Sequence, residues 1–219
     1  MIMHSGGTMK YVLVLPVISL ALLLVDAALA ADSLNVRLVG YCDTPGNARD
    51  VVVGGGYAYV ADGAAGLRVI AVSDPAHPVE VGYCETRGSA CGVTVAGSYA
   101  YVADFGGLCV IDVSARTAPH ETGYCDTPGQ ARDVAVAGNY AYVADGLAGL
   151  RVIDVSNPAS PSEVGCCDDT VDDSFGVAVA GGYTYVADDS CHRVRVIDVA
   201  DPANPRERVA TRRRVRPMA

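Results

Sequence analysis

The sequence predicts an all-β protein, a β-propeller built from four repeats of about 42 residues with four antiparallel strands in each blade. Three observations support this prediction. One short motif recurs four times, the residues between its copies follow a fixed order of strand-like and turn-like segments, and the repeat region shows no helical period. The chain has 219 residues, 51% of them hydrophobic and 19% charged, which suits a packed core and excludes general disorder.

Two short motifs define the repeats. The first is Gly-Tyr-Cys followed by an acidic residue and Thr, and its copies begin at Gly40, Gly82, Gly123 and, in a looser form, Gly165. The second is Tyr-x-Tyr-Val-Ala-Asp, and its copies lie at 57–62, 99–104, 140–145 and 183–188. Four copies at one spacing indicate repeated supersecondary units.

The third repeat shows how four strands fit into one unit. Tyr140 and Tyr142 alternate with Ala141 and Val143, so the tyrosines are predicted to lie on one face of a strand and the smaller residues on the other. Gly138 precedes this strand, where a tight hairpin needs a positive φ. The four predicted strands are 133–136, 140–144, 150–155 and 163–167.

The first and third strands of each repeat are nearly continuous runs of Val and Ile, so we expect both of their faces to be buried. A sheet with two buried faces needs a neighbour on each side, as a propeller blade has. Four blades close into a ring only if the first and last share strands. Segment 35–42 matches a fourth strand without the three before it, and we expect it to complete the last blade.

The alternative to a closed four-bladed ring is a truncated one. Residues 206–216 contain six Arg, whereas the whole chain has a formal net charge of −9. An acidic repeat region therefore changes abruptly into a basic segment. This change indicates either a truncated or frame-shifted longer gene or a basic tail that contacts an anionic surface.

The N-terminal residues have the order of a secretory signal peptide. Lys10 is followed by the uncharged segment 11–25 and by the small-residue run 27–30, so we expect cleavage after Ala30. The uncharged segment is too short to cross the ~30 Å hydrocarbon core, and Gly, Asp and Pro interrupt every later apolar run. We therefore expect an extracytoplasmic protein, secreted, periplasmic or on the cell surface, and its eight Cys suit an oxidising compartment.

The segment Leu-Arg-Val-Ile-Asp-Val at 150–155 follows a Tyr-Val-Ala-Asp and precedes an Asn-Pro-x-x-Pro turn. This arrangement resembles the LVIVD repeat family, and the resemblance covers residues 38 to about 207. It implies an extracytoplasmic propeller of bacteria or archaea and supplies no catalytic residues. The YVTN surface-layer propellers are less similar, because this chain has Asp where their motif has Asn.

The repeats and the resemblance together divide the chain into three parts. Residues 1–30 are the expected signal peptide, and 31–207 are the repeat domain. Residues 208–219 form an Arg-rich tail that we expect to be disordered. The expected repeats are approximately 38–80, 81–121, 122–163 and 164–207.

The loops that lead into the innermost strands are the candidate ligand site, because together they form one rim of the central channel. Two repeats have Arg-Asp at this position, whereas the other two have Cys-Gly and Phe-Gly. The predicted ligand-binding residues are Arg49, Asp50, Cys91, Arg132, Asp133 and Phe175. The alternative is that each Arg-Asp pair only bridges adjacent loops.

Each Tyr-x-Tyr-Val-Ala-Asp motif also places an acidic residue at the same position of its blade. These residues are Asp62, Asp104, Asp145 and Asp188. A ring of carboxylates could bind Ca²⁺, but equivalent positions in different blades lie too far apart to share an ion. We therefore expect each Asp to cap the turn after its strand, and we predict no metal site and no cofactor.

The cysteines offer one candidate disulfide. Equivalent cysteines on the outermost strands of different blades lie too far apart to bond. When the third and fourth strands of the second repeat are folded about 115–119, Cys109 comes opposite Cys125, with the register uncertain by one residue. We predict a cross-strand disulfide between these two.

The function expected from these features is non-enzymatic: a secreted or cell-surface scaffold that binds an extracellular protein or a carbohydrate. The alternatives are a hydrolase or lactonase with its site at the channel mouth, or a fragment of a longer repeat protein without a function of its own. Short, uniform loops favour the scaffold. The acidic charge excludes a nucleic-acid partner, and we expect a monomer without a membrane span after the signal peptide is removed.

Overall fold

The computed structural model describes residues 37–168, 173–188 and 192–207. The predicted signal peptide and the Arg-rich tail lie outside the described residues. The chain divides into two units, Met1–Tyr41 and Cys42–Ala219, and the strands belong to the second. Within the described ranges, no helix has the length and apolar character needed to cross a membrane.

The second unit contains four antiparallel sheets, which we call blades 1 to 4, and each consists of four strands that are consecutive in sequence. Blade 1 contains β1 (Asp50–Gly54), β2 (Tyr57–Ala61), β3 (Leu67–Ala71) and β4 (Val79–Cys84). Blade 2 contains β5 (Gly92–Ala96), β6 (Tyr99–Ala103), β7 (Phe105–Asp112) and β8 (His120–Ala131). Blade 3 contains β9 (Asp133–Ala137), β10 (Tyr140–Ala144), β11 (Leu150–Asp154) and β12 (Ser162–Cys167). Blade 4 contains β13 (Ser174–Ala180), β14 (Tyr183–Asp188), β15 (Arg193–Asp198) and β16 (Arg206–Glu207). The prediction of an all-β propeller with four strands per blade is confirmed.

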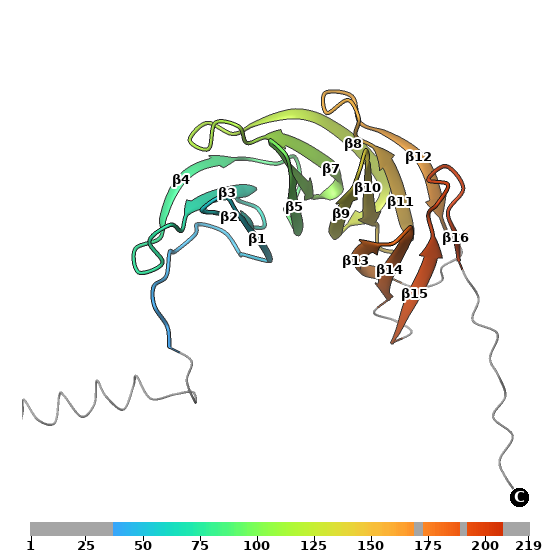
Figure 1. Ribbon diagram of the computed structural model, residues 1–219, viewed down its shortest axis with the longest axis horizontal. Helices are drawn as coiled ribbons and strands as arrows, with labels where there is room; N and C mark the ends of the chain where they lie inside the picture. Colours follow the sequence, from blue (N-terminus) through green and yellow to red (C-terminus); the bar gives the residue numbers. More distant parts are fainter. Residues whose placement is uncertain (1–36, 169–172, 189–191, 208–219) are drawn as a thin grey trace, which may run out of the picture. The chain divides into compact units, whose positions relative to one another are not determined.

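The first strands of successive blades contact one another, β1 with β5, β5 with β9 and β9 with β13. Figure 1 shows the four sheets of the second unit following one another along an open arc, with these first strands on its inner side. The sheets do not close into a ring. The expectation that segment 35–42 completes the last blade is wrong, because residues 37–42 form no strand and β16 is the fourth strand of blade 4.

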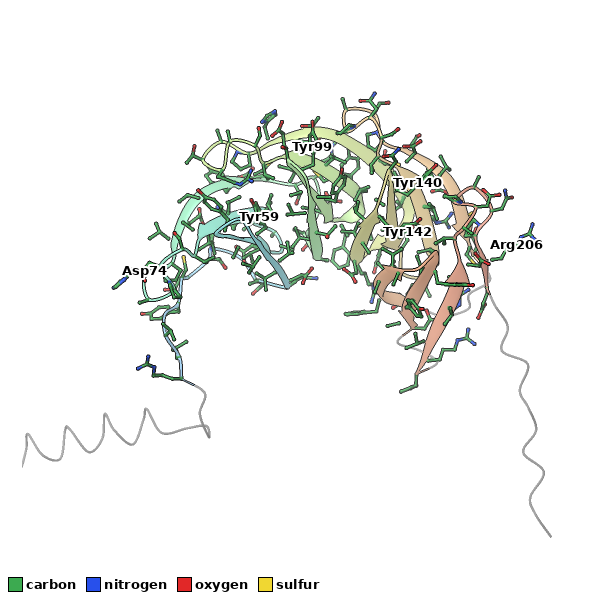
Figure 2. All side chains as sticks on the ribbon, in the orientation of Figure 1. Tyr59, Asp74, Tyr99, Tyr140, Tyr142 and Arg206 are labelled. Carbon is green, nitrogen blue, oxygen red and sulfur yellow. The ribbon has the colours of Figure 1, made fainter. Side chains whose placement is uncertain are left out.

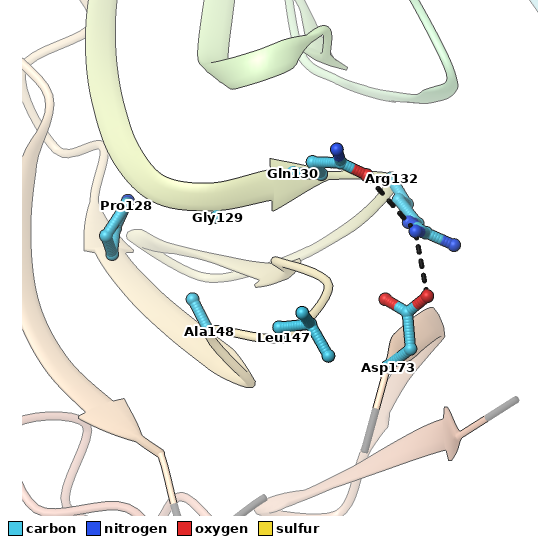
Figure 3. A pocket seen from close by; sticks show the side chains of 7 residues that line it. All are labelled: Pro128, Gly129, Gln130, Arg132, Leu147, Ala148 and Asp173. Carbon is cyan, nitrogen blue, oxygen red and sulfur yellow. Dashed lines mark hydrogen bonds and ion pairs between the residues drawn. The ribbon is translucent and has the colours of Figure 1, made fainter. Parts of the chain in front are cut away.

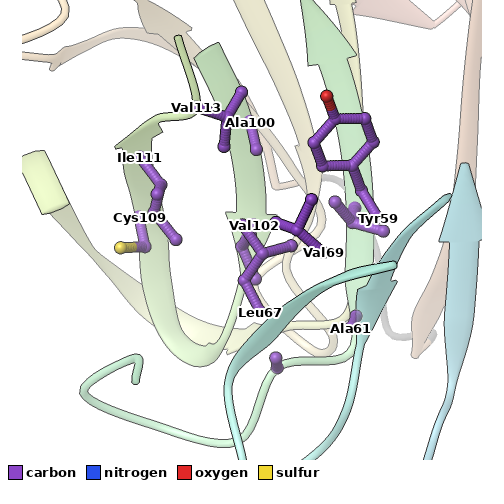
Figure 4. Close-up of a cluster of buried hydrophobic side chains, with 11 residues drawn as sticks. Tyr59, Ala61, Leu67, Val69, Ala100, Val102, Cys109, Ile111 and Val113 are labelled. Carbon is purple, nitrogen blue, oxygen red and sulfur yellow. The ribbon is translucent and has the colours of Figure 1, made fainter. Parts of the chain in front are cut away.

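The apolar core lies between the blades. In the cluster between blades 1 and 2, Tyr59 and Leu67 pack against Val102 and Ile111, and all four side chains are almost fully buried (Figure 4). Similar clusters lie between blades 2 and 3 and between blades 3 and 4. Figure 2 shows Tyr59 within the arc of sheets and Asp74 on its outer side.

The alternation predicted for the third repeat is confirmed. Ala141 and Val143 pack in the cluster shared with blade 2, whereas Tyr142 packs in the cluster shared with blade 4. One strand thus serves two interfaces, because successive side chains point to opposite faces of a sheet.

The expectation that first and third strands are buried on both faces holds only for the third strands of blades 1 to 3, because Val194 of β15 is 65% exposed. β3, β7 and β11 each bury a continuous run of residues. In β1, by contrast, Val51 is 57% exposed and Val53 is 66% exposed. The expectation is wrong for β1, because a described sheet covers only one side of blade 1.

The buried aspartates connect each blade to the loop that leads into it. Asp145 accepts hydrogen bonds from the Thr127 hydroxyl at 2.6 Å and from the Gly129 amide at 2.8 Å. It also lies 3.7 Å from Nε of Arg151, a buried residue of the third strand. Asp62 makes the equivalent contacts in blade 1. As expected, the backbone of each Asp closes the turn after its strand, since the amides of Ala65 and Ala148 donate to the carbonyls of Asp62 and Asp145, both at 3.1 Å. Their side chains bind the incoming loop instead.

Blade 2 stabilises its aspartate differently, because Cys109 replaces the arginine of the third strand. The Tyr124 hydroxyl donates a hydrogen bond to Asp104 at 2.8 Å. The guanidinium of Arg87 covers the Tyr124 ring at 4.1 Å and pairs with Glu121 at 2.7 Å. Arg87 of the incoming loop thus pairs with Glu121, as the third-strand arginines of blades 1 and 3 pair with the equivalent glutamates.

We expect Asp145→Ala to lower the free energy of unfolding by about 3 kcal/mol, because it leaves a buried arginine without one of its carboxylate partners. Equilibrium denaturation at pH 7 measures this loss. Asp154→Ala is the control, since Asp154 is the half-buried last residue of β11 and its carboxylate accepts a hydrogen bond from the Ser156 amide, whereas the buried arginine of β11 pairs with Asp145. Its loss should be much smaller, and equal losses in the two variants would contradict the role of Asp145.

Candidate functional site

Four of the six predicted rim residues meet in one pocket. Arg49, Cys91, Arg132 and Phe175 line a pocket of about 430 Å³, which we call the rim pocket. Phe105, the first residue of β7, is its fifth lining residue. This volume lies in the range of small-molecule sites.

The backbone of the strands fixes the position of the rim side chains. The amide of Arg49 donates to the carbonyl of Ala61, the last residue of β2, at 2.8 Å. The amide of Cys91 donates in the same way to the carbonyl of Ala103 in blade 2. The amide of Arg132 donates to the carbonyl of Ala144 in blade 3. The loops that lead into blades 1 to 3 are therefore each bonded to the end of the second strand of their own blade, which fixes the rim side chains at equivalent positions.

Two arginines of the rim pocket lie over aromatic rings. The guanidinium carbon of Arg49 is 5.3 Å from the ring centre of Phe105, and its Nη1 donates to the Cys91 sulfur at 3.2 Å. The guanidinium carbon of Arg132 is 5.3 Å from the ring centre of Phe175. In both pairs, the arginine precedes an odd-numbered blade and the ring belongs to the next one.

Asp50 and Asp133 do not line the rim pocket. Asp50 accepts hydrogen bonds from its neighbour Val51 and from Val93 of blade 2, both at 2.8 Å. Asp133 accepts from Val134 and from Val177 of blade 4, also at 2.8 Å. Each carboxylate therefore joins the first strand of its own blade to that of the next. This role differs from the predicted ligand contact and agrees with the alternative that the Arg-Asp pairs bridge adjacent loops, since Arg49 also contacts Cys91 of the next loop.

These two carboxylates do not form a metal centre. Each already accepts two backbone N–H groups, and the described residues contain no group of three or more His, Cys, Asp or Glu side chains that could hold an ion. Burial raises the pKa of Asp133, and the like charge of Asp50 adds to this effect.

Phe105 was not among the predicted site residues. It has a φ of +66°, a conformation that is uncommon for a bulky residue, and it stands where the first and third repeats have Gly63 and Gly146. These three residues make the same backbone bridge to the next blade, in this case from Phe105 to Ala131. The signal in the sequence was the replacement of Gly by Phe at a position that needs a positive φ.

Cys91 is a neutral thiol at physiological pH. Burial raises its pKa, and the nearby charge of Arg49 opposes this effect only in part. A nucleophilic cysteine needs a lowered pKa. The residues that line the rim pocket thus comprise two cations, two aromatic rings and a protonated thiol, a set suited to binding.

A second pocket, of about 590 Å³, lies beside Arg132 (Figure 3). Arg132 donates to Gln130 at 3.2 Å and pairs with Asp173 at 2.8 Å. Its guanidinium therefore lines both pockets while two polar groups hold it in place.

The predicted disulfide is absent. Cys109 pairs across the strands with Tyr124, whereas Cys125 pairs with Leu108. Successive residues point to opposite faces, so Cys109 packs in the cluster between blades 1 and 2 and Cys125 against the cluster between blades 2 and 3. Both are free thiols, and burial raises the pKa of each. The predicted disulfide is wrong, because the true register of the two strands differs by one residue from the one used to predict it.

The sheets and the rim pocket define a β-propeller-type repeat protein with a ligand-sized pocket among the inner loops of its blades. The LVIVD repeat matches the chain four times, at 45–86, 87–127, 128–169 and 173–210, and the chain belongs to the LVIVD repeat family. The resemblance inferred from the sequence is thereby confirmed. A search of curated proteins finds no match.

Three solved structures share the fold. Hydrazine synthase of Kuenenia stuttgartiensis matches with a TM-score of 0.60 and 16% identity over 77% of this chain and 51% of that one. The computationally designed Ika4 protein matches with a TM-score of 0.59 and 10% identity over 74% of this chain and 98% of its own. The designed Ika8 protein matches with a TM-score of 0.56 and 7% identity over 68% and 45%. The chain thus spans about half the length of hydrazine synthase and Ika8, and at these identities the likeness shows the fold alone.

The raised pKa of Asp133 predicts a pH dependence. Its stabilising contribution is complete below the unfolded pKa of about 3.9 and is lost as pH rises through the higher folded pKa. We therefore expect the stability of the wild-type chain to fall relative to Asp133→Asn as pH rises from 4, in denaturation measured at several pH values.

Asp154→Asn provides the control with the opposite sign. Hydrogen bonds from Ser156 lower the pKa of Asp154, so the wild-type chain should gain stability relative to this variant as pH rises through 4. A trend of the same sign in both variants would contradict the assignment.

The positive φ of Phe105 predicts an unusual response to glycine. Phe105→Gly relieves left-handed strain of about 1–2 kcal/mol and adds chain entropy worth about 0.5–1 kcal/mol. We expect the free energy of unfolding to rise by up to about 1 kcal/mol in thermal denaturation. Phe175→Gly lies in the same pocket at a residue without a positive φ, and should lower stability. Equal losses in both variants would exclude strain at Phe105.

Proposed function

We propose that this protein is an extracytoplasmic binding module that takes an acidic carbohydrate in the rim pocket. The observation that carries the proposal is the pair of guanidinium groups, those of Arg49 and Arg132, in one pocket that no carboxylate side chain lines. A guanidinium binds a carboxylate or sulfate through charge-assisted hydrogen bonds. The Nη2 of Arg132 already contacts Gln130 and Asp173, so this residue has its Nη1 group left for a ligand.

The aromatic rings of the rim pocket suit the apolar face of a sugar. Phe175 is 57% exposed although it lies within a strand, so its ring offers an open surface beside the guanidinium of Arg132. A few polar groups set among apolar ones are typical of small-molecule sites. An acidic sugar would meet both kinds of group at once.

The pocket is locally basic in an acidic protein. The chain has a formal net charge of −9, yet the charged side chains that line the rim pocket are both arginines. Although Arg132 also pairs with Asp173 at 2.8 Å, two guanidinium groups that line one pocket favour an anionic ligand over a neutral one and make its binding sensitive to salt.

Two further points support a binding role outside the cytoplasm. The LVIVD family is generally extracytoplasmic, which agrees with the signal peptide expected from the sequence. The rim carboxylates Asp50 and Asp133 accept backbone N–H groups, Asp173 pairs with Arg132, and Cys91 remains a thiol. A hydrolase or lactonase would need an activated base or nucleophile, and these groups do not offer one.

We expect isothermal titration with an oligogalacturonate to detect binding that weakens as salt rises. Arg132→Gln should weaken it about tenfold or more, because a hydrogen bond to a charged group is worth about 1.5–3 kcal/mol. Arg49→Gln should do the same. Arg206→Gln is the control, since Arg206 is an exposed arginine of the outer strand β16 (Figure 2).

The neutral oligosaccharide of the same length is the second control and should bind much more weakly. Equal binding of the neutral and acidic sugars would overturn the proposal, and so would unchanged affinity in both rim variants. A loss caused equally by Arg206→Gln would show that net charge, rather than the rim pocket, governs binding.

A further inference from the structure

The two ends of the arc carry blade faces that resemble the buried interfaces within it. We call the face that a blade turns to the preceding blade its leading face, and the face that it turns to the next blade its trailing face. Blades 1 to 3 cover their trailing faces with the next blade. The leading face of blade 1 and the trailing face of blade 4 have no such cover in the described part of the chain.

The leading face of blade 1 has the side chains of a buried interface. Val51 is 57% exposed, whereas its equivalents Val93 and Val134 are 5% and 4% exposed. Those two pack in the clusters that blades 2 and 3 share with the blade before them. A preceding blade covers Val93 and Val134, whereas no described blade precedes Val51.

The trailing face of blade 4 shows the same contrast. Tyr185 is 40% exposed, whereas its equivalents Tyr59 and Tyr142 are 1% and 4% exposed. Val194 is 65% exposed, and Leu67 at the equivalent position of blade 1 is fully buried. Exposed apolar side chains gathered on one face mark an interaction surface.

The order of the blades indicates which blade fits beyond blade 4. Asp50 and Asp133 join blade 1 to blade 2 and blade 3 to blade 4. Between blades 2 and 3, the equivalent position is Gly92, where a Cβ atom would lie only 2.7 Å from the Cα of Asp133. Blade 4 again has a glycine, Gly176, so the alternation continues if the next blade begins with an aspartate.

Blade 1 is such a blade, and its leading face already holds part of an interface. Cys42 packs against Ala58, Val60 and Ile70, as Cys84 of the outer strand of blade 1 packs against the next cluster. Cys42 therefore stands where a preceding blade would place its outer strand.

We propose that two copies of this chain join head to tail, the trailing face of blade 4 in each copy covering the leading face of blade 1 in the other. A two-fold axis makes both junctions equivalent and closes one ring, whereas repeated addition without closure would give a filament. This pairing replaces the monomer expected from the sequence and does not depend on the ligand proposed above.

Sedimentation equilibrium of the full chain tests the pairing, together with light scattering after gel filtration. We expect twice the mass of one chain. Val194→Lys and Val51→Glu each place a charge on one of the two faces, at exposed positions where the fold should tolerate it, and each should halve the mass. Val79→Lys is the control, because Val79 is also 57% exposed but lies on the outer strand β4.

Mixing the two charged variants separates a specific junction from general loss of solubility. One junction of the mixed pair then sets the introduced lysine opposite the introduced glutamate and the other is unaltered, since the equivalent residues Leu108 and Val134 share one buried cluster. The mixture should therefore regain the mass of a pair. A wild-type mass of one chain, an open series of larger species, or an equal loss in Val79→Lys would overturn the proposal.

Discussion

The burial of two apolar faces on every sheet is the constraint on which the rest of this structure depends. Each of blades 1 to 3 has Tyr, Leu and Val on one face and Ala, Val and Ile on the other, and burying one such large side chain is worth about 1.5–3 kcal/mol. A single sheet cannot cover both of its faces, so each is stable only between neighbours. The same constraint explains why Val51 and Val194, at the ends of the arc, are exposed while their equivalents within it are buried.

Polar contacts then fix how each incoming loop sits on its blade. Asp62 and Asp145 hold a threonine hydroxyl, a glycine amide and an arginine in a buried position. A buried charge is tolerated only with such partners. In blade 2 these partners differ, yet Asp104 still accepts three hydrogen bonds. In all three blades the aspartate binds the incoming loop, although the groups that bind it differ. This indicates that the fold depends on the position of the loop rather than on any one side chain.

The rim pocket is a consequence of these loops. Because the loops that lead into blades 1 to 3 are each bonded to the end of the second strand of their own blade, side chains that are about 42 residues apart in sequence emerge side by side. Phe105 completes the pocket in a conformation that bulky residues rarely adopt, and such strain is often found where a side chain serves a function. The pocket thus combines a rigid frame with side chains that differ from repeat to repeat.

The sequence by itself determined the strands, their grouping into four blades and four of the five residues of the rim pocket, because these follow from a periodic pattern within each repeat. Only the tertiary structure decided that the arc stays open, that Asp50 and Asp133 join blades, and that Phe105 belongs to the pocket, since these depend on contacts between repeats. The register of Cys109 and Cys125 also escaped prediction. A bulge between Val110 and Ile111 shifts the pairing, and the alternation of side chains then places the two thiols on opposite faces of the sheet.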